Sequence, residues 1–306
     1  MPHVALVLAA MLSLFATLAH AKTSNQCGED GVWVQILGSG GAELTDARAA
    51  PSYLVWVDDH ARLLVDPGPG SALRFEESGA NFNDLDVIAF SQLTADHSAD
   101  LAALVRGSLD SERDRPLPVL GPEGNDGYPS MRTFLERFIG PAGVYPDLKD
   151  YLTFRTGSYK ISATNVPATG SRRWARFGTE NLRLAAIPVH HGAVPALAWR
   201  AAIGNISITF AGDFNNDGNP MQVFAKGTDA LIVSLGITES SRGELRDLYA
   251  LPSQLGRIAQ EADARMLILG HRSVRTRGLE TQTETKIRES YAGPLIFGNE
   301  LECWGL

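Results

Sequence analysis

Apolar runs of four to eight residues recur along the chain, and most are followed at once by glycine and polar residues. Such runs are typical of buried β-strands. Two stretches with apolar residues at helical spacing, 71–80 and 129–139, predict helices, and a third helix begins at Leu101. The expected strands cover residues 32–37, 52–57, 61–65, 85–90, 117–120, 182–189, 206–211, 230–235 and 266–269.

Histidine and aspartate residues follow several of these strands directly. The chain has seven histidines; two precede residue 21 and His60 lies in an expected turn, whereas the other four all stand at strand ends. Strand ends on one edge of an α/β protein build binding sites, so we expect these groups to meet. A lone histidine there is more often structural, but four of them with two aspartates favour a metal site, for zinc or for iron or manganese. The residues are Asp96, His97, His190, His191, Asp213 and His271.

Five segments, in chain order, resemble the motifs of the metallo-β-lactamase superfamily, most closely its ribonuclease Z and arylsulfatase-like branch. They are Asp66-Pro67-Gly68, residues 90–101 with a damaged Thr-His-x-His-x-Asp-His motif, residues 189–200, residues 210–213 and residues 267–271. The resemblance implies an α/β fold of four layers, αβ/βα. In that fold two mixed β-sheets pack face to face, with helices on both outer faces.

The resemblance also implies which residues hold metal. In the family two ions share one bridging aspartate, which corresponds to Asp213. The first ion keeps only His191 and this aspartate, because Gln92 and Thr94 stand where the motif has its first two histidines. The second ion keeps all its ligands, which are Asp96, His97, Asp213 and His271.

The altered positions decide the expected number of ions. The neutral oxygens of Gln92 and Thr94 bind transition metals far more weakly than imidazole does. We therefore expect one zinc ion, with a second that is weak or absent, and iron or manganese as alternatives. By the same resemblance, Asp66 supports the site without touching metal, and His190 is a neighbour of His191 outside the ligand set.

This arrangement favours a metal-dependent hydrolase acting on an ester or phosphodiester-type small molecule. Asp96 would hold the metal and orient water, and His191 would give a proton to the leaving group. The alternative is a catalytically degenerate member that acts as a binding or structural protein, because two ligands of a two-metal clamp are gone. Metal content separates the two hypotheses.

The N-terminus predicts export. Residues 4–19 are almost entirely apolar and run into Ala19-His20-Ala21, so we expect a signal peptide at 1–21 and a single domain at 22–306, in a secreted or periplasmic protein. The alternative is a membrane anchor, for which the run is short. Cys27 and Cys303 are the only cysteines, and in an oxidising compartment they predict one disulfide; two free thiols are the alternative.

Charge argues against nucleic acid as a partner. The formal net charge is −8, whereas binding to phosphates requires lysine and arginine. The basic cluster 172–176 would be an anion-binding patch or, as we prefer, a solvated loop. A calcium loop starting at Asp213 is rejected, because its twelfth position holds Phe224 and a strand precedes it.

Overall fold

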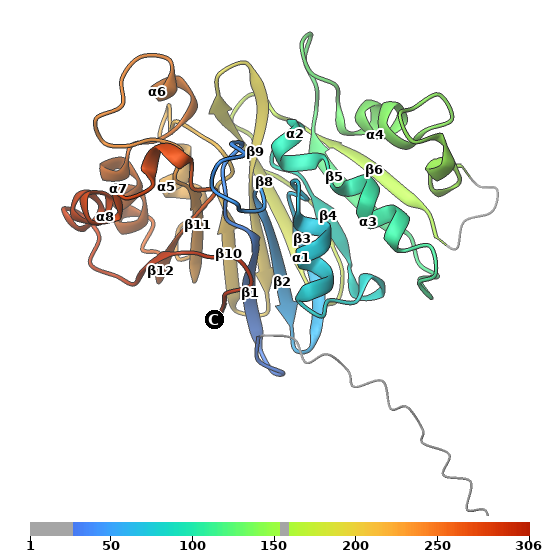
Figure 1. The fold of residues 1–306 in the computed structure, drawn as a ribbon. Helices are drawn as coiled ribbons and strands as arrows, with labels where there is room; N and C mark the ends of the chain where they lie inside the picture. Colours follow the sequence, from blue (N-terminus) through green and yellow to red (C-terminus); the bar gives the residue numbers. More distant parts are fainter. Residues whose placement is uncertain (1–26, 154–158) are drawn as a thin grey trace, which may run out of the picture.

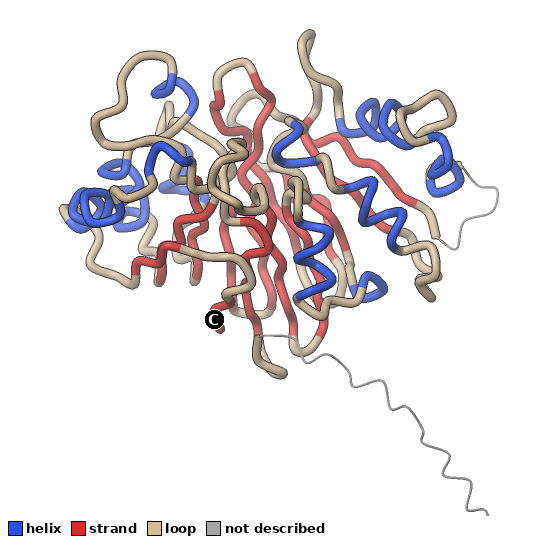
Figure 2. The backbone as a smooth tube through the Cα atoms, viewed as in Figure 1, coloured by secondary structure: helices blue, strands red, loops and turns tan. Residues whose placement is uncertain are grey.

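Two seven-stranded sheets form the centre of the molecule, as the computed structural model shows (Figures 1 and 2). The structure describes residues 27–153 and 159–306, so the predicted signal peptide lies outside the described residues. Helices cover the outer face of each sheet, and the predicted four-layer sandwich is confirmed. Within the described ranges, no helix combines the length and apolar character needed to cross a membrane.

The first sheet has the strand order β14-β1-β2-β3-β4-β5-β6. Strands β14, β1, β2 and β3 pair antiparallel, and β3 to β6 pair parallel. The bounds are β1 (Val32–Gly38), β2 (Ser52–Val57), β3 (His60–Val65), β4 (Val87–Ala89), β5 (Leu117–Pro122), β6 (Ile161–Val166) and β14 (Cys303–Gly305).

The second sheet has the order β13-β12-β11-β10-β9-β8-β7 and is also mixed. Strands β7 to β10 pair antiparallel, and β10 to β13 pair parallel. The bounds are β7 (Trp174–Gly178), β8 (Arg183–His191), β9 (Val194–Ile203), β10 (Ile206–Phe210), β11 (Ala230–Ser234), β12 (Met266–Gly270) and β13 (Leu295–Phe297).

Three apolar clusters separate the four layers. The middle cluster lies between the sheets, and the outer two lie beneath α1, α3 and α4 on one side and beneath α5, α7 and α8 on the other. The helices are α1 (Ser71–Glu77), α2 (Ala95–Ser98), α3 (Leu101–Gly107), α4 (Met131–Ile139), α5 (Pro220–Phe224), α6 (Leu245–Leu248), α7 (Pro252–Glu261) and α8 (Glu280–Arg288), with short 3-10 helices η1 (Phe82–Asp84), η2 (Pro146–Tyr151) and η3 (Val274–Thr276).

Three local expectations need correction. The strand expected at 182–189 continues to His191, because it pairs along its whole length with β9 in a hairpin. The basic cluster is not entirely a loop, since residues 174–178 form the exposed edge strand β7. His60 is the first residue of β3 and forms an ion pair with Asp84 (3.0 Å), so it is not a free turn residue.

Two hydrogen bonds tie the sheets together beside the ends of β4 and β9. The indole Nε1 of Trp199 donates to the carbonyl oxygen of Phe90 over 2.9 Å. The backbone N–H of Leu197 donates to the carbonyl oxygen of Ser91 over 2.8 Å. Both acceptors lie just after β4, so the second sheet fixes the segment that leads into the damaged motif.

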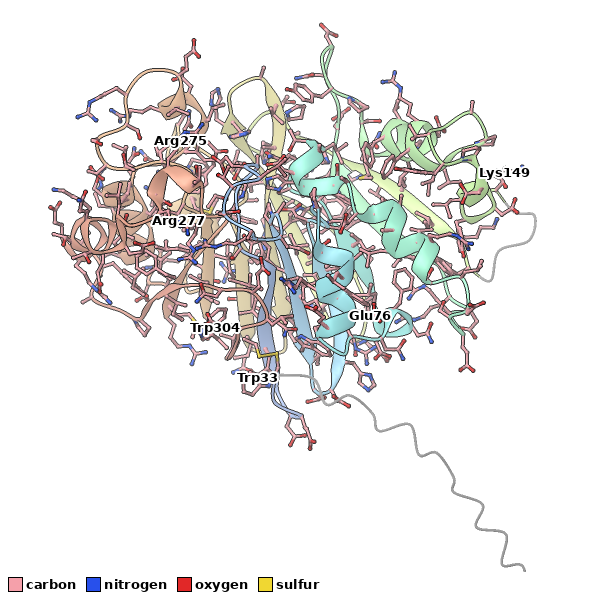
Figure 3. All side chains as sticks on the ribbon, viewed as in Figure 1. Trp33, Glu76, Lys149, Arg275, Arg277 and Trp304 are labelled. Atoms are coloured by element: carbon pink, nitrogen blue, oxygen red, sulfur yellow. A yellow bond between two sulfur atoms is a disulfide. The ribbon has the colours of Figure 1, made fainter. Side chains whose placement is uncertain are left out.

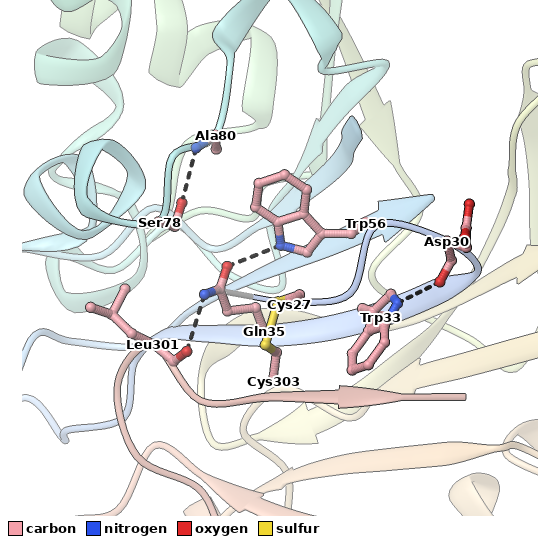
Figure 4. The surroundings of a disulfide bond; sticks show 9 residues. All are labelled: Cys27, Asp30, Trp33, Gln35, Trp56, Ser78, Ala80, Leu301 and Cys303. Atoms are coloured by element: carbon pink, nitrogen blue, oxygen red, sulfur yellow. Dashed lines mark hydrogen bonds between the residues drawn. A yellow bond between two sulfur atoms is a disulfide. The ribbon is translucent and has the colours of Figure 1, made fainter. Parts of the chain in front are cut away.

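A disulfide joins Cys27 to Cys303, with 5.8 Å between their Cα atoms (Figure 4). Strand β14 begins at Cys303 and pairs with β1, and Gln35 stands opposite Cys303. The side chain of Gln35 donates to the carbonyl oxygen of Leu301 and accepts from the indole of Trp56, which anchors the C-terminal segment further. In Figure 3 the yellow disulfide lies close to Trp33 at the foot of the sandwich.

We predict that Cys303→Ser lowers the free energy of unfolding by about 2–5 kcal/mol, because the bridge closes a very long loop of the unfolded chain. Denaturant unfolding with and without a reductant measures the effect. Reductant should bring the wild type to the stability of the variant and leave the variant unchanged. A wild type that is insensitive to reductant, with two thiols open to labelling after unfolding, would contradict the prediction.

Candidate metal centre

The predicted site residues converge at one edge of the sandwich, where strands of both sheets end. Asp66 follows β3, the α2 segment follows β4, and His191 is the last residue of β8. Asp213 lies just beyond β10, and His271 follows β12 directly. Asp96 and His97 lie within the short helix α2, ahead of the helix expected from Leu101. All of these except Asp96 are buried, and the Asp96 side chain is 19% exposed.

Three imidazole rings are oriented by hydrogen bonds at Nδ1. His97 Nδ1 lies 3.1 Å from Asp66 Oδ2, His191 Nδ1 lies 2.8 Å from the carbonyl oxygen of Leu248, and His271 Nδ1 lies 2.9 Å from that of Gly40. A carbonyl oxygen only accepts, so Nδ1 of His191 and His271 carries the proton. In a neutral ring Nε2 then holds a lone pair, the arrangement seen in metal-bound histidines.

The three Nε2 atoms face one oxygen, Oδ2 of Asp213. It lies 3.4 Å from Nε2 of His97, 3.7 Å from that of His191 and 3.3 Å from that of His271. Asp96 Oδ2 is 3.7 Å from His97 Nε2 and 3.8 Å from His271 Nε2. Tetrahedral zinc bound at about 2.0–2.1 Å requires ligand atoms roughly 3.3–3.5 Å apart, so the observed spacing suits a small cation.

Buried polar atoms without partners mark the same point. Among the residues that the structure describes, Nε2 of His97, Nε2 of His271 and Oδ1 of Asp213 have no hydrogen-bond partner. An unpaired buried polar atom is costly, and several at one place call for an explanation. Asp96, His97 and His271 also form a group whose ligand atoms lie within 4.8 Å of one another. The donor set therefore fits a metal ion, with zinc favoured by its imidazole and carboxylate chemistry.

Asp66 holds the site from behind. Its Oδ1 accepts the backbone N–H of Ser91 and its Oδ2 accepts the Ser91 hydroxyl, both over 2.6 Å, while Oδ2 also meets His97. Asp66 adopts a left-handed backbone (φ 54°), in which the chain turns sharply after β3. The carboxylate thus links the ends of β3 and β4 and fixes the His97 ring.

Two glycines allow the backbone to close around the site. A side chain at Gly68 would place Cβ only 2.2 Å from the carbonyl oxygen of Asp96. Gly212 has φ 64°, and its Cβ would lie 3.0 Å from Ser91 and from the Leu197 carbonyl. Glycine is therefore required at both places for the strand ends to approach each other.

Gln92 and Thr94 lie together beside Asp213, where the sequence predicted the altered ligand positions. The Gln92 side-chain Nε2 donates to Asp213 Oδ2 over 3.1 Å and to Thr94 Oγ1 over 3.0 Å. These bonds orient the amide so that its N–H groups, and not its oxygen, face the carboxylate. A hydrogen-bond donor therefore occupies the position next to Asp213.

His190 points away from this cluster. Its side chain is 51% exposed, and its Nδ1 contacts the Asn215 amide at 2.9 Å and lies 3.9 Å from Asp217. The structure therefore brings His191, and not His190, together with the other ligand candidates. His190 instead contacts the loop that contains Asn215 and Asp217.

The buried charges shift one another's pKa values. Burial lowers the pKa of His97, but Asp66 and Asp213 outweigh it and hold that pKa well above the ordinary value. Burial raises the pKa of Asp213, yet His271 and His97 bring it well below its usual range. Burial also lowers the pKa of His271, but Asp213 outweighs burial and raises that pKa above its ordinary value. A metal ion would compete with protons for these nitrogens, so its affinity rises with pH.

Sequence reasoning missed the segment 238–250, which contains α6 and contributes no side chain to the group of ligand candidates. Its Leu248 carbonyl orients His191, and the Tyr249 ring packs edge-on against His191 with 5.3 Å between ring centroids. A cavity of about 1270 Å³ opens beside the β8–β9 hairpin and is lined by His191, Arg173 and Arg200 among others. The other ligand candidates do not line this cavity. The metal centre is therefore identified by the distances among its ligand atoms and not by the cavity.

Comparison with known proteins follows the same lines. Residues 61–272, more than two thirds of the chain, match the family model described as the beta-lactamase superfamily domain. The chain belongs to this superfamily. Its relatives place it in the metallo-β-lactamase-fold group, near ribonuclease Z. Ribonuclease Z of Clostridium acetobutylicum is 36% identical over 158 residues, which are 51% of this chain and 45% of that protein.

Two further proteins are similar to this chain over most of its length. Ribonuclease Z of Thermoplasma volcanium is 25% identical over 302 residues, covering 88% of this chain and 97% of that protein. The crystal structure of the short form of human tRNase Z superposes with a TM-score of 0.68 at 17% identity, covering 89% of this chain and 98% of the other. The structural match shows a shared fold.

We predict that His97→Ala and His271→Ala each abolish tight metal binding, because each removes one of about four ligands. His191→Ala should keep most of the metal, since His191 is not one of the four ligands expected at the intact site. Elemental analysis of purified protein, with zinc or manganese added, measures the ion content. His60→Ala, a change at a partly exposed ion pair, is the control. Equal loss in all three site variants would mean that the ligands are misassigned.

The altered positions give a second prediction. Gln92→His with Thr94→His should create a second metal site, because two imidazoles would join His191 and Asp213 in a set of four ligands. Each single change should add little. The number of ions per chain is the readout, measured on folded protein. A folded double variant with no additional metal would show that these side chains do not occupy the missing ligand positions.

Proposed function

We propose that this protein is a metal-dependent hydrolase with one intact metal site, acting on an ester or phosphodiester-type small molecule. The observation that carries the proposal is the meeting of His97 and His271 Nε2 with the carboxylates of Asp96 and Asp213 at a buried strand edge. Ligand rings already oriented at Nδ1 fit a site built for an ion. The relatives named ribonuclease Z support hydrolysis at a phosphodiester.

The four residues of the intact site divide into binding and positioning roles. His97, His271, Asp213 and Asp96 would hold the ion, which when bound polarises a substrate oxygen and lowers the pKa of water. Asp96 is the most exposed of the four, so its carboxylate is placed to orient the attacking water.

His191 is placed for proton transfer to the leaving group. Its Nδ1 donates to the carbonyl oxygen of Leu248 and its Nε2 lies on the side of Asp213, so in the doubly protonated ring Nε2 carries the proton that would pass to the leaving group. His191 also lines the neighbouring cavity, so a leaving group that occupies the cavity would lie beside this residue.

The substrate we propose is a small molecule, not a nucleic acid, because the net charge of −8 disfavours phosphate-rich polymers. Phosphodiesters, sulfate esters, lactones and β-lactams all present an oxygen that a single ion can polarise. We also propose that the protein is secreted or periplasmic. The apolar leader at 1–21 and the Cys27–Cys303 disulfide support that location.

One observation favours a second function. The Gln92 amide donates to Asp213 in place of a cation, which would stabilise this carboxylate in a protein that no longer catalyses a reaction. A binding or structural role without chemistry is therefore the alternative.

A metal-dependent hydrolase should contain about one tightly bound ion per chain and turn over bis(4-nitrophenyl) phosphate, a 4-nitrophenyl sulfate, a lactone or a β-lactam. Activity should vanish on treatment with a chelator and return with zinc or manganese. Asp96→Asn should lower kcat about 10²–10⁴-fold, because a neutral amide orients water poorly. Purified protein that holds no metal, takes up none and cleaves none of these substrates would support the binding or structural role instead.

A further inference from the structure

Tyr249 occupies a defined position at the mouth of the candidate metal centre. Its ring meets the His191 ring edge-on, with 5.3 Å between centroids and 70° between planes. The ring also packs against Gly236, where a Cβ would lie 2.4 Å from it. The absence of a side chain at 236 therefore makes room for the phenol. The backbone N–H of Tyr249 donates to Leu245, which closes the turn after α6.

The Tyr249 hydroxyl has no hydrogen-bond partner among the residues that the structure describes. The oxygen atom of this hydroxyl is partly exposed to solvent. Two other buried tyrosine hydroxyls are paired: Tyr291 donates to the carbonyl oxygen of Ala264, and Tyr159 pairs with the hydroxyl of Ser108. A half-buried phenol without a protein partner is free to bind a ligand atom.

The charged groups around Tyr249 are those of the metal centre and its rim. Burial raises the pKa of the Tyr249 phenol. The carboxylates of Asp213, Asp96 and Glu43 raise this pKa further, whereas Arg275 lowers it. Arg275, labelled in Figure 3, is held by Glu43 at 2.9 Å and so is committed to its own ion pair. Tyr249 therefore offers an O–H donor beside His191, one of the ligand candidates.

We propose that the Tyr249 hydroxyl donates a hydrogen bond to a non-bridging oxygen of a tetrahedral anionic group bound at the metal centre, such as a phosphate or sulfate ester. This inference rests on the proposed function, because the anion is held in part by the ion. The phenol hydroxyl stabilises negative charge at that oxygen. In two-metal sites the first ion supplies part of this stabilisation. It makes and breaks no covalent bond in this role.

Tyr249→Phe tests the proposal, because it keeps the ring that packs on His191 and Gly236 and removes one oxygen. Inorganic phosphate is the probe, and calorimetry on the metal-loaded protein gives its Kd. We expect Kd to rise about ten- to hundredfold, as for a lost hydrogen bond to a charged group. Metal content should stay the same. Where an ester is hydrolysed, kcat should fall about 10²-fold or more, as for a lost oxyanion donor. Tyr145→Phe, at a largely exposed ring beside Phe138, is the matched control.

The outcomes separate this inference from the proposed function. An unchanged Kd for phosphate at unchanged metal content overturns the role of Tyr249, and hydrolysis by the wild type still stands. A variant that loses its metal also overturns it, since the phenol would then be structural. Wild-type protein that holds metal but does not bind phosphate overturns it as well. Absence of any hydrolysis refutes the proposed function, and the phosphate titration still decides the role of Tyr249.

Discussion

The candidate site depends on a single buried carboxylate, that of Asp213, which needs positive or hydrogen-bond-donating neighbours to remain charged. A buried carboxylate without compensation is costly enough to prevent the fold or to become protonated. The structure surrounds Asp213 Oδ2 with three imidazoles and one amide, and it draws them from both sheets. The packing of the strand ends, the glycines that let them approach and the hydrogen bonds behind each ring all serve this one charge.

The change at Gln92 takes on a definite physical meaning in this context. Its N–H groups stand against Asp213 and Thr94, so a hydrogen-bonded arrangement occupies the place where the family resemblance predicts two histidine ligands. An amide hydrogen carries a partial positive charge where a cation would carry a full one. The fold can thus keep Asp213 charged with fewer ions than a two-metal site holds. The substrate would then meet one metal ion fewer to polarise it.

Much of this arrangement was predictable because each ligand follows an apolar run that can only be a buried strand. Asp213 and His271 were located this way, whereas the strand end offered both His190 and His191, and the family resemblance chose His191. The order of motifs identified the fold. Four features were not predictable. The α2 turn has no long apolar stripe, the extension of β8 to His191 depends on pairing with β9, and the amide orientation of Gln92 depends on Asp213, distant in sequence. Tyr249 carries no metal-ligand signal, and its role comes from contacts with Gly236 and His191.

Strand β14 covers β1 at the edge of the first sheet, so two segments that lie far apart in the sequence must meet to complete that sheet. When β14 is not docked, β1 presents unpaired backbone N–H and C=O groups, and such an edge can pair with strands of other chains. Docking of β14 therefore protects a partly folded chain against aggregation as well as completing the sheet.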